Sequence, residues 1–171
     1  MATAYLSLGS NIEPERHLRA AVHALREAFG AVRLSPWYRT PAVGFDGDDF
    51  LNAAAAIETE LSPQALNHWL HDLEARQGRR RGPGIARFSS RSLDVDIVLY
   101  DDLVLRGDGH LELPRAELAE QAFVLKPMVD IAPDLVHPTT HRRLDAMWRD
   151  FEGSREGLHR VDGPEGPAHR G

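Results

Sequence analysis

Residues 3–30 read TAYLSLGSNIEPERHLRAAVHALREAFG, a strand pattern followed directly by a helix pattern. The apolar run at residues 3–8 predicts a strand that ends in a short turn at residues 9–11. Pro14 suits the first turn of a helix, where no N–H is needed, and Gly30 suits the position after its last turn. Between them one apolar face recurs at helical spacing, on Leu18, Val22, Leu25 and Phe29. The stretch therefore predicts a strand and an amphipathic helix that packs on a sheet.

The next stretch predicts two strands joined by a long loop. Residues 32–39 have a strand composition interrupted by Pro36, which suits an edge strand or a bulge because proline cannot donate to the ladder. Residues 40–49 are rich in Pro, Gly and Asp and predict an irregular surface loop. Residues 50–60 then predict a third strand.

A second helix and a fourth strand complete the pattern. Ser62 and Pro63 are a helix start signal, and Gly78 is the matching stop. Residues 92–100, SLDVDIVLY, alternate as a strand, with Leu93, Val95, Ile97 and Leu99 expected on its apolar face. The order β-α-β, β-α-β predicts an α+β fold: a ferredoxin-like antiparallel sheet with helices packed on it.

The C-terminal third is less regular. The patterns of residues 113–118 and 123–131 do not assign a helix or a strand, although Pro127 and Pro133 limit any helix there. A last short helix is predicted at residues 142–151.

Length and composition indicate one folded domain. We expect it to span residues 1–152, followed by a disordered tail at residues 153–171, which are rich in Gly, Pro and His. The 171 residues carry 20 Lys and Arg against 26 Asp and Glu, a formal net charge of −6 that disfavours a nucleic-acid coat. There is no cysteine, which excludes disulfides and thiolate zinc sites. The N-terminus lacks signal-peptide features and no run reaches membrane-spanning length, so we expect a cytoplasmic protein.

The negative total conceals a positive stretch. Residues 76–91, RQGRRRGPGIARFSSR, hold six arginines and no carboxylate, which favours a local anion site. Asp94 and Asp96 follow at once, and alternation on a strand places them on one face about 6–7 Å apart. Two such carboxylates repel each other unless a cation lies between them, and hard oxygen ligands suit Mg²⁺, singly or in a two-metal arrangement.

The arginines and carboxylates together resemble a phosphoryl-transfer site, in which cations neutralise the developing charge. The alternative is that Asp94 and Asp96 lie on a solvated strand face and the arginines keep a loop soluble. No P-loop pattern is present, so phosphate would be held by side chains and metal.

Other polar residues carry weaker signals. His68 and His71 are three apart on the second helix without an acidic ligand at metalloprotease spacing, so we expect surface histidines. His17 is likewise expected on the polar side of the first helix. Asn52, in an otherwise apolar strand, needs hydrogen-bond partners; with Phe50 on the same side, it would also suit the edge of a heterocycle.

Six motifs, in order, are similar to one known family. The motifs YLSLGSN, YRTPAVG, DFLNAAAAIET, LEARQGRRR, RSLDVDIVLYDD and LP…AFVLKPMVDIAPDLVHP resemble 6-hydroxymethyl-7,8-dihydropterin pyrophosphokinases across about residues 3–140. The resemblance implies a ferredoxin-like fold with long substrate-covering loops. It also implies a Mg-dependent transferase of folate biosynthesis, with two Mg²⁺, that moves pyrophosphate from ATP to the pterin hydroxymethyl group and releases AMP.

Carried over by motif position, the resemblance assigns site residues. Asp94 and Asp96 look like the ligands of both ions, with Asp94 near the substrate hydroxyl, and Arg79 and Arg91 look like the other catalytic residues. The pterin would lie against Thr40, Pro41, Val43, Phe50, Asn52 and Phe123. ATP would be bound by Glu74, Arg79, Arg87, Arg91, Ile97 and Arg115. The expected partners are these two substrates and not nucleic acid or membrane; we expect a monomer, with other folate-pathway enzymes as conceivable partners.

The chain departs from the family pattern at three places. The usual Arg-Trp-Gly/Ala-Pro-Arg loop end reads RFSSR at residues 87–91, where Phe88 can still supply an aromatic lid. Where the family usually has a histidine, this chain has Arg115. Where the family frequently has an arginine on the nucleotide side, this chain has Gln121. Since a guanidinium is bidentate and permanently charged, we hypothesise that Arg115 contacts the triphosphate.

The residues by themselves leave two other functions open. A ferredoxin-like sheet can present aromatics and arginines to RNA, although the usual aromatic signature is missing. A metal-dependent phosphohydrolase would use the same carboxylates and release phosphate without a pterin.

Overall fold

The computed structural model describes residues 1–42, 47–78, 92–108 and 111–161. Within them the core is an antiparallel sheet in the order β5-β1-β4-β3-β8, with β2 also paired to β4. Its strands are β1 (Ala2–Ser10), β2 (Arg33–Leu34), β3 (Trp37–Thr40), β4 (Phe50–Thr59), β5 (Asp94–Tyr100) and β8 (His159–Val161). A separate two-stranded sheet consists of β6 (Leu105–Asp108) and β7 (Leu111–Leu113).

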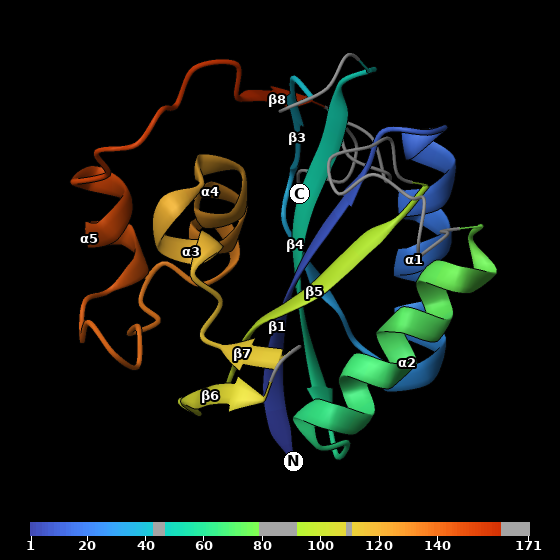
Figure 1. The fold of residues 1–171 in the computed structure, drawn as a ribbon, viewed down its shortest axis with the longest axis horizontal. Coiled ribbons are helices and arrows are strands. Elements are labelled where there is room, and N and C mark those ends of the chain that lie inside the picture. Colours follow the sequence, from blue (N-terminus) through green and yellow to red (C-terminus); the bar gives the residue numbers. More distant parts are fainter. Residues whose placement is uncertain (43–46, 79–91, 109–110, 162–171) are drawn as a thin grey trace.

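Helices cover both faces of the sheet, which gives three layers (Figure 1). One face carries α1 (Pro14–Phe29) and α2 (Pro63–Arg76), whose leucines share a core with β1, β4 and β5. The other face carries α3 (Glu117–Glu120), α4 (Ala122–Ile131) and α5 (Leu144–Arg149) around a second core. The order β1-α1-β2/β3-β4-α2-β5 and its antiparallel pairing confirm the predicted ferredoxin-like fold.

Strand β1 is longer than its sequence predicts. Residues 9 and 10, expected in a turn, remain in the strand, because Gly9 pairs with Asn52 on one side and Asp94 on the other. A residue bonded on both sides of a sheet stays extended, whatever its turn propensity.

Strand β5 also departs from simple alternation. The register between β1 and β5 shifts between Tyr5 and Leu6, as at a β-bulge. Val95 and Ile97 face the α1–α2 core as expected, but Leu99 belongs to the α4–α5 core. A bulge adds one residue to a strand, so the side chains beyond it lie on the face opposite to the one that simple alternation predicts.

The prediction of a disordered tail from residue 153 is wrong for its first part. Residues 159–161 form β8 and pair with β3, so β3 is not the edge strand that Pro36 suggested. Pro36 instead separates β2 from β3, both paired to β4. Residues 162–171 lie outside the described residues.

Two further expectations were wrong in part. Pro127 does not end a helix: α4 continues through it and stops at Ile131, two residues before Pro133. The buried face of α4 outweighs the one helical bond that proline cannot donate. His17, expected on the polar side of α1, is only 5% exposed and its Nδ1 lies 2.9 Å from Oε1 of Gln77.

Candidate functional site

Three polar residues and a glycine, one from each of four strands, lie in one row across the sheet. Asp94 of β5 pairs with Gly9 of β1, Gly9 pairs with Asn52 of β4, and Asn52 pairs with Tyr38 of β3. Directly opposed residues of antiparallel strands share a face, so all four lie on one side. Tyr38 donates its hydroxyl to Asp130 of α4, which identifies this side as the α4 face. Asp94 and Asn52 are therefore two strand spacings apart, about 10 Å, with only a glycine between them.

Gly9 keeps the space between these side chains open. A Cβ at this position would lie 3.2 Å from Oδ1 of Asn52 and 3.9 Å from Cδ1 of Phe50. The first distance is tighter than ordinary van der Waals contact, so any larger residue would displace the amide. The sequence predicts only a turn at Gly9, because the role of this glycine depends on strands that are distant from it along the chain.

Asn52 has the partner that a buried amide requires. Its side chain is buried and its Nδ2 donates to Oγ1 of Thr40 at 2.8 Å. Thr40 pairs with Phe50, and both are half-buried. The structure thus brings together Thr40, Phe50 and Asn52, with the exposed Pro41 next in the chain. Val43 lies outside the described residues.

The carboxylates of β5 are crowded, as their spacing predicted. Asp94 and Asp96 are both half-buried. Burial, and then the negative charge of Asp94, raise the pKa of Asp96 to about 7. Nη1 of Arg115 lies 3.8 Å from Oδ1 of Asp96 and opposes this shift. A carboxylate pair held this way is ready to accept further positive charge.

Arg115 is bound by acidic side chains in this structure. Besides its approach to Asp96, its Nη2 donates to Oε2 of Glu117 at 2.9 Å. The residue follows β7 and precedes α3, and its backbone N–H donates to the carbonyl of Val98 in β5. The sequence did not indicate this contact between Arg115 and Asp96.

Two of the predicted nucleotide residues lie on the other side of β5. Glu74 of α2 is fully buried, and its Oε2 accepts the N–H of Val95 at 2.6 Å. Ile97 is 1% exposed within the α1–α2 core. Glu74 therefore holds the backbone between Asp94 and Asp96, and the Ile97 side chain belongs to the core.

The remaining predicted residues are divided between the described and the undescribed parts of the chain. Phe123 lies in the first turn of α4, half-buried against the α4–α5 core. Arg79, Arg87, Phe88 and Arg91 lie outside the described residues. Gln121 immediately precedes α4 and is exposed.

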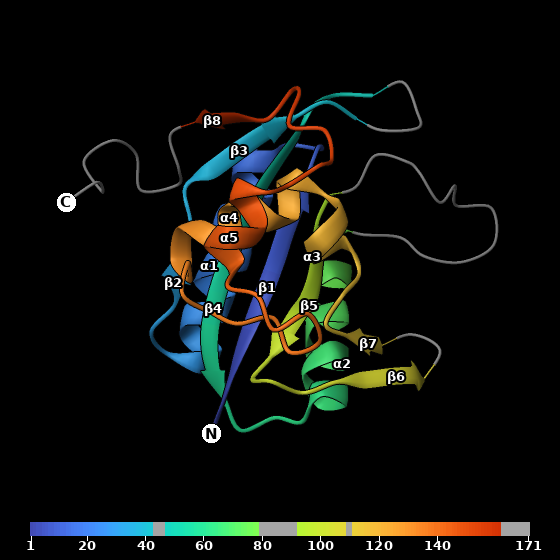
Figure 2. The same cartoon turned by 90° about the vertical axis from the view of Figure 1, so that its left-hand side faces the viewer.

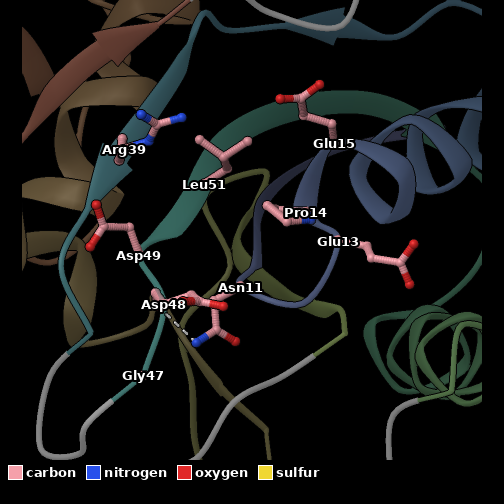
Figure 3. Close-up of a pocket in the computed structure, with 9 residues that line it drawn as sticks. All are labelled: Asn11, Glu13, Pro14, Glu15, Arg39, Gly47, Asp48, Asp49 and Leu51. Carbon is pink, nitrogen blue, oxygen red and sulfur yellow. Dashed lines mark hydrogen bonds between the residues drawn. The ribbon is translucent and has the colours of Figure 1, made fainter.

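A hollow of about 510 Å³ opens on the opposite, α1 side of the sheet (Figure 3). It is lined by Asn11, Glu13, Pro14, Glu15, Arg39, Gly47, Asp48, Asp49 and Leu51. None of these is a predicted site residue, and four carboxylates against one arginine would repel a triphosphate. The buried Asn11 donates its Nδ2 to the carbonyl of Asp48 at 3.0 Å, which ties the end of β1 to residues 47–49.

His68, the acidic and histidine groups and the helices of the described residues add no further residue to this site. His68 is exposed, as expected, with Nε2 3.5 Å from Oδ2 of Asp72. In the described part of the chain, no group of three or more His, Cys, Asp or Glu is placed to hold a metal ion. None of the described helices has the length and apolarity needed to cross a membrane.

Comparison with known proteins identifies the family. Residues 5–133 match the family model described as 7,8-dihydro-6-hydroxymethylpterin-pyrophosphokinase (HPPK). Two relatives named 2-amino-4-hydroxy-6-hydroxymethyldihydropteridine pyrophosphokinase are similar. The one from Haemophilus influenzae is 38% identical over 144 residues, 82% of this chain and 88% of the relative. The one from Methylorubrum extorquens is 44% identical over 140 residues, 80% of this chain and 86% of the relative.

Solved structures agree at the level of the fold. A structure described as HPPK-DHPS in complex with substrates has a TM-score of 0.72 at 12% identity over 94% of this chain. Wild-type Plasmodium falciparum HPPK-DHPS has a TM-score of 0.69 at 11% identity over 88% of this chain. This chain spans under half of each of those chains, 46% and 44%. The sequence match and the fold together show that the chain belongs to the 7,8-dihydro-6-hydroxymethylpterin-pyrophosphokinase family.

Proposed function

We propose that the α4 face around Gly9 is the active site of a diphosphotransferase. The reaction transfers pyrophosphate from ATP to the hydroxymethyl group of 6-hydroxymethyl-7,8-dihydropterin and gives the pterin diphosphate and AMP, in folate biosynthesis. The observation that carries this placement is the row Asp94–Gly9–Asn52, in which a carboxylate and a buried amide share one face across a glycine.

The pterin subsite lies on the Asn52 side of Gly9. The Thr40 hydroxyl and the Asn52 amide offer donors and acceptors to the polar edge of a pterin ring. Phe50 and Phe123 supply apolar faces of the kind on which a flat heterocycle stacks. We assign Pro41 and Val43 to the rim of the same subsite, by motif position.

The phosphate subsite lies on the Asp94 side. The crowded pair Asp94 and Asp96 fits Mg²⁺, which takes one or two carboxylates and completes its shell with water and phosphate oxygens. We propose two ions, which when bound would neutralise charge on the transferred phosphates. Arg79, Arg87, Arg91 and Arg115 would add positive charge around ATP. Glu74 holds the backbone of β5, and Ile97 anchors β5 in the α1–α2 core.

The two subsites define the reacting atoms. The hydroxymethyl oxygen attacks the β-phosphorus of ATP, the bond from that phosphorus to the bridging oxygen of the α-phosphate breaks, and AMP leaves with that oxygen. We propose that Asp94, the carboxylate beside the pterin subsite, orients the attacking hydroxyl and accepts its proton. We further propose that the enzyme acts as a cytoplasmic monomer without nucleic-acid or membrane partners.

The test is to incubate the protein with MgATP, with and without 6-hydroxymethyl-7,8-dihydropterin, and to identify the nucleotide product. AMP that forms only with the pterin is expected. Phosphate or ADP without pterin would instead indicate a phosphohydrolase, and salt-sensitive RNA binding without turnover would indicate an RNA-binding module. Asp94→Asn and Asp96→Asn should each lower AMP formation by about 100-fold or more. Asp102→Asn, on an exposed turn, is the control and should stay at the wild-type rate.

A further inference from the structure

The chain after α5 returns to the sheet and lies close to Pro41, at the rim of the proposed pterin subsite, and to Glu120, which ends the helix before Phe123. Residues 152–161 lie beyond the part that matches the family model, which ends at residue 133. Figures 1 and 2 show this segment leaving α5, passing the end of α4 and joining the sheet as β8. We call residues 152–161 the C-terminal strap.

The strap is anchored at α5 by one arginine. The guanidinium of Arg155 lies 4.2 Å from the centroid of the Trp148 ring, within cation–π range. Its Nη2 donates to the backbone carbonyls of Trp148 and Phe151. These carbonyls lie at and just after the last turn of α5, so Arg155 adds a cationic donor to this helix end and fixes where the strap begins.

The first contact is with the α3–α4 corner, which leads into Phe123. A Cβ on Gly153 would lie 2.5 Å from Cζ of Phe151 and 3.4 Å from the carbonyl oxygen of Glu120. Glu120 is the last residue of α3, three positions before Phe123. The strap backbone therefore packs closely on the corner that carries one proposed pterin wall.

The second contact is with Pro41, at the rim of the subsite. Gly157 has a φ of +80°, and a Cβ there would lie 2.8 Å from Cδ of Pro41. Beyond it β8 pairs with Trp37, Tyr38 and Arg39 of β3, the strand that leads directly into Thr40 and Pro41. The close approach at Pro41 requires glycine both for its backbone conformation and for its lack of a side chain.

We infer that the C-terminal strap positions the Pro41 side and the Phe123 side of the pterin subsite relative to each other, with Gly157 and Arg155 as positioning residues. This inference rests on the proposed function. Neither residue touches substrate: Gly157 acts through Pro41, and Arg155 acts by holding the start of the strap. Because the strap contacts Pro41 and the corner that leads into Phe123, its loss affects pterin binding more than ATP binding.

The test compares Gly157→Ala with Gly30→Ala. Gly30 ends α1 with a φ of +84°, and a Cβ there would meet nothing within 4 Å, so both variants place an alanine at a positive φ but only Gly157→Ala presses on Pro41. Gly157→Ala should raise the KM for the pterin by about fivefold to tenfold, with the KM for ATP and kcat changed by less than about twofold. Gly30→Ala should leave both KM values at the wild-type level.

A second pair of variants guards against misfolding of Gly157→Ala. Arg155→Ala removes the anchor, while Arg149→Ala removes an exposed arginine that pairs with Asp150, the residue after α5. Only Arg155→Ala should raise the pterin KM and weaken pterin binding measured by calorimetry with a non-hydrolysable ATP analogue. An unchanged pterin KM in both strap variants, or a parallel rise in both KM values, would overturn the inference. Absence of pterin-dependent AMP from the wild-type protein would instead overturn the proposed function.

Discussion

Asp96 shows how one residue links stability to function. Its pKa is raised to about 7 by burial and by Asp94, so the folded protein binds this proton more tightly than the unfolded chain, where the pKa is near 3.8. The stability contributed by protonated Asp96 is therefore present below about pH 4 and is lost as the pH rises to about 7. Above pH 7 the metal-free protein holds two repelling carboxylates, a strain that bound cations would relieve.

Asp96→Asn should therefore stabilise the metal-free protein at pH 8 by about 1–2 kcal/mol, discounted for the partial exposure of the side chain. Thermal unfolding in EDTA should show a melting temperature roughly 3–6 °C above wild type at pH 8, and a much smaller difference at pH 4.5. Asp102→Asn is the control and should show no such pH dependence. A gain of equal size at both pH values would contradict the electrostatic origin.

Gly9→Ala tests the open space between the two subsites. The added Cβ, 3.2 Å from Oδ1 of Asn52, should push the amide away from Thr40 and narrow the space beside Phe50. We expect the pterin KM to rise by about tenfold, since a lost or misaligned hydrogen bond of this kind costs about 1–1.5 kcal/mol. Steady-state kinetics with each substrate varied in turn would measure it, with the KM for ATP as the internal reference. Equal changes in both KM values would argue against a pterin-specific role.

At the scale of elements, α2 and β5 are joined by a buried charge. Glu74 is fully buried and accepts the Val95 N–H at 2.6 Å, and Val95 lies between the two aspartates. β5 ends the order of paired strands, so this N–H does not rely on another strand of the main sheet. A helix side chain thus satisfies a strand edge and sets the position of the carboxylates.

Glu74→Ala should lower the free energy of unfolding by about 2–3 kcal/mol, because a buried N–H loses its charged acceptor. It should also lower kcat, since Asp94 and Asp96 are no longer held by the backbone between them. Glu74→Gln keeps an acceptor oxygen and should recover part of both losses. Urea unfolding and initial rates of AMP formation would measure the two effects, and full activity in Glu74→Ala would refute the positioning role.

At the scale of the whole molecule, the two faces of the sheet differ in what they leave accessible. Helices α1 and α2 cover one face (Figure 1), and a large apolar core fills the space between them and the sheet except at the polar hollow beside the start of α1. The α4 face has its own core, but near the ends of β4 and β5 it leaves Phe50, Asp94 and Asp96 half-buried. One face therefore supports the sheet, and the other both supports it and carries the proposed site.

Leu25→Ala and Leu125→Ala test this division. Leu25 of α1 and Leu125 of α4 are both fully buried, and each truncation should lower the free energy of unfolding by about 2–5 kcal/mol. Well below the melting temperature, Leu25→Ala should keep wild-type KM values. Leu125→Ala should raise the pterin KM, because α4 carries Phe123. Identical kinetics in both variants would show that the faces do not differ in this way.

The errors of prediction have physical reasons. Pro127 stayed in a helix and residues 159–161 joined the sheet because buried contacts and an available strand edge outweighed local propensity. Periodicity alone predicts His17 on the polar side, although Gln77, the residue after α2, offers it a half-buried partner. In contrast, the buried faces of α1 and α2 and the shared face of Asp94 and Asp96 follow from spacing along one element, which the sequence contains in full.

What the sequence determined by itself is local: the order of strands and helices, the pairing of Asp94 with Asp96 on one face, and the motifs of the family. What only the tertiary structure decided is the neighbourhood of these residues. Asn52 meets Thr40, Gly9 separates Asn52 from Asp94, Arg115 approaches Asp96, and the C-terminal strap reaches Pro41. Periodicity reports which side of an element a residue occupies, whereas contacts between distant segments depend on strand order and register, which are set only when the cores pack.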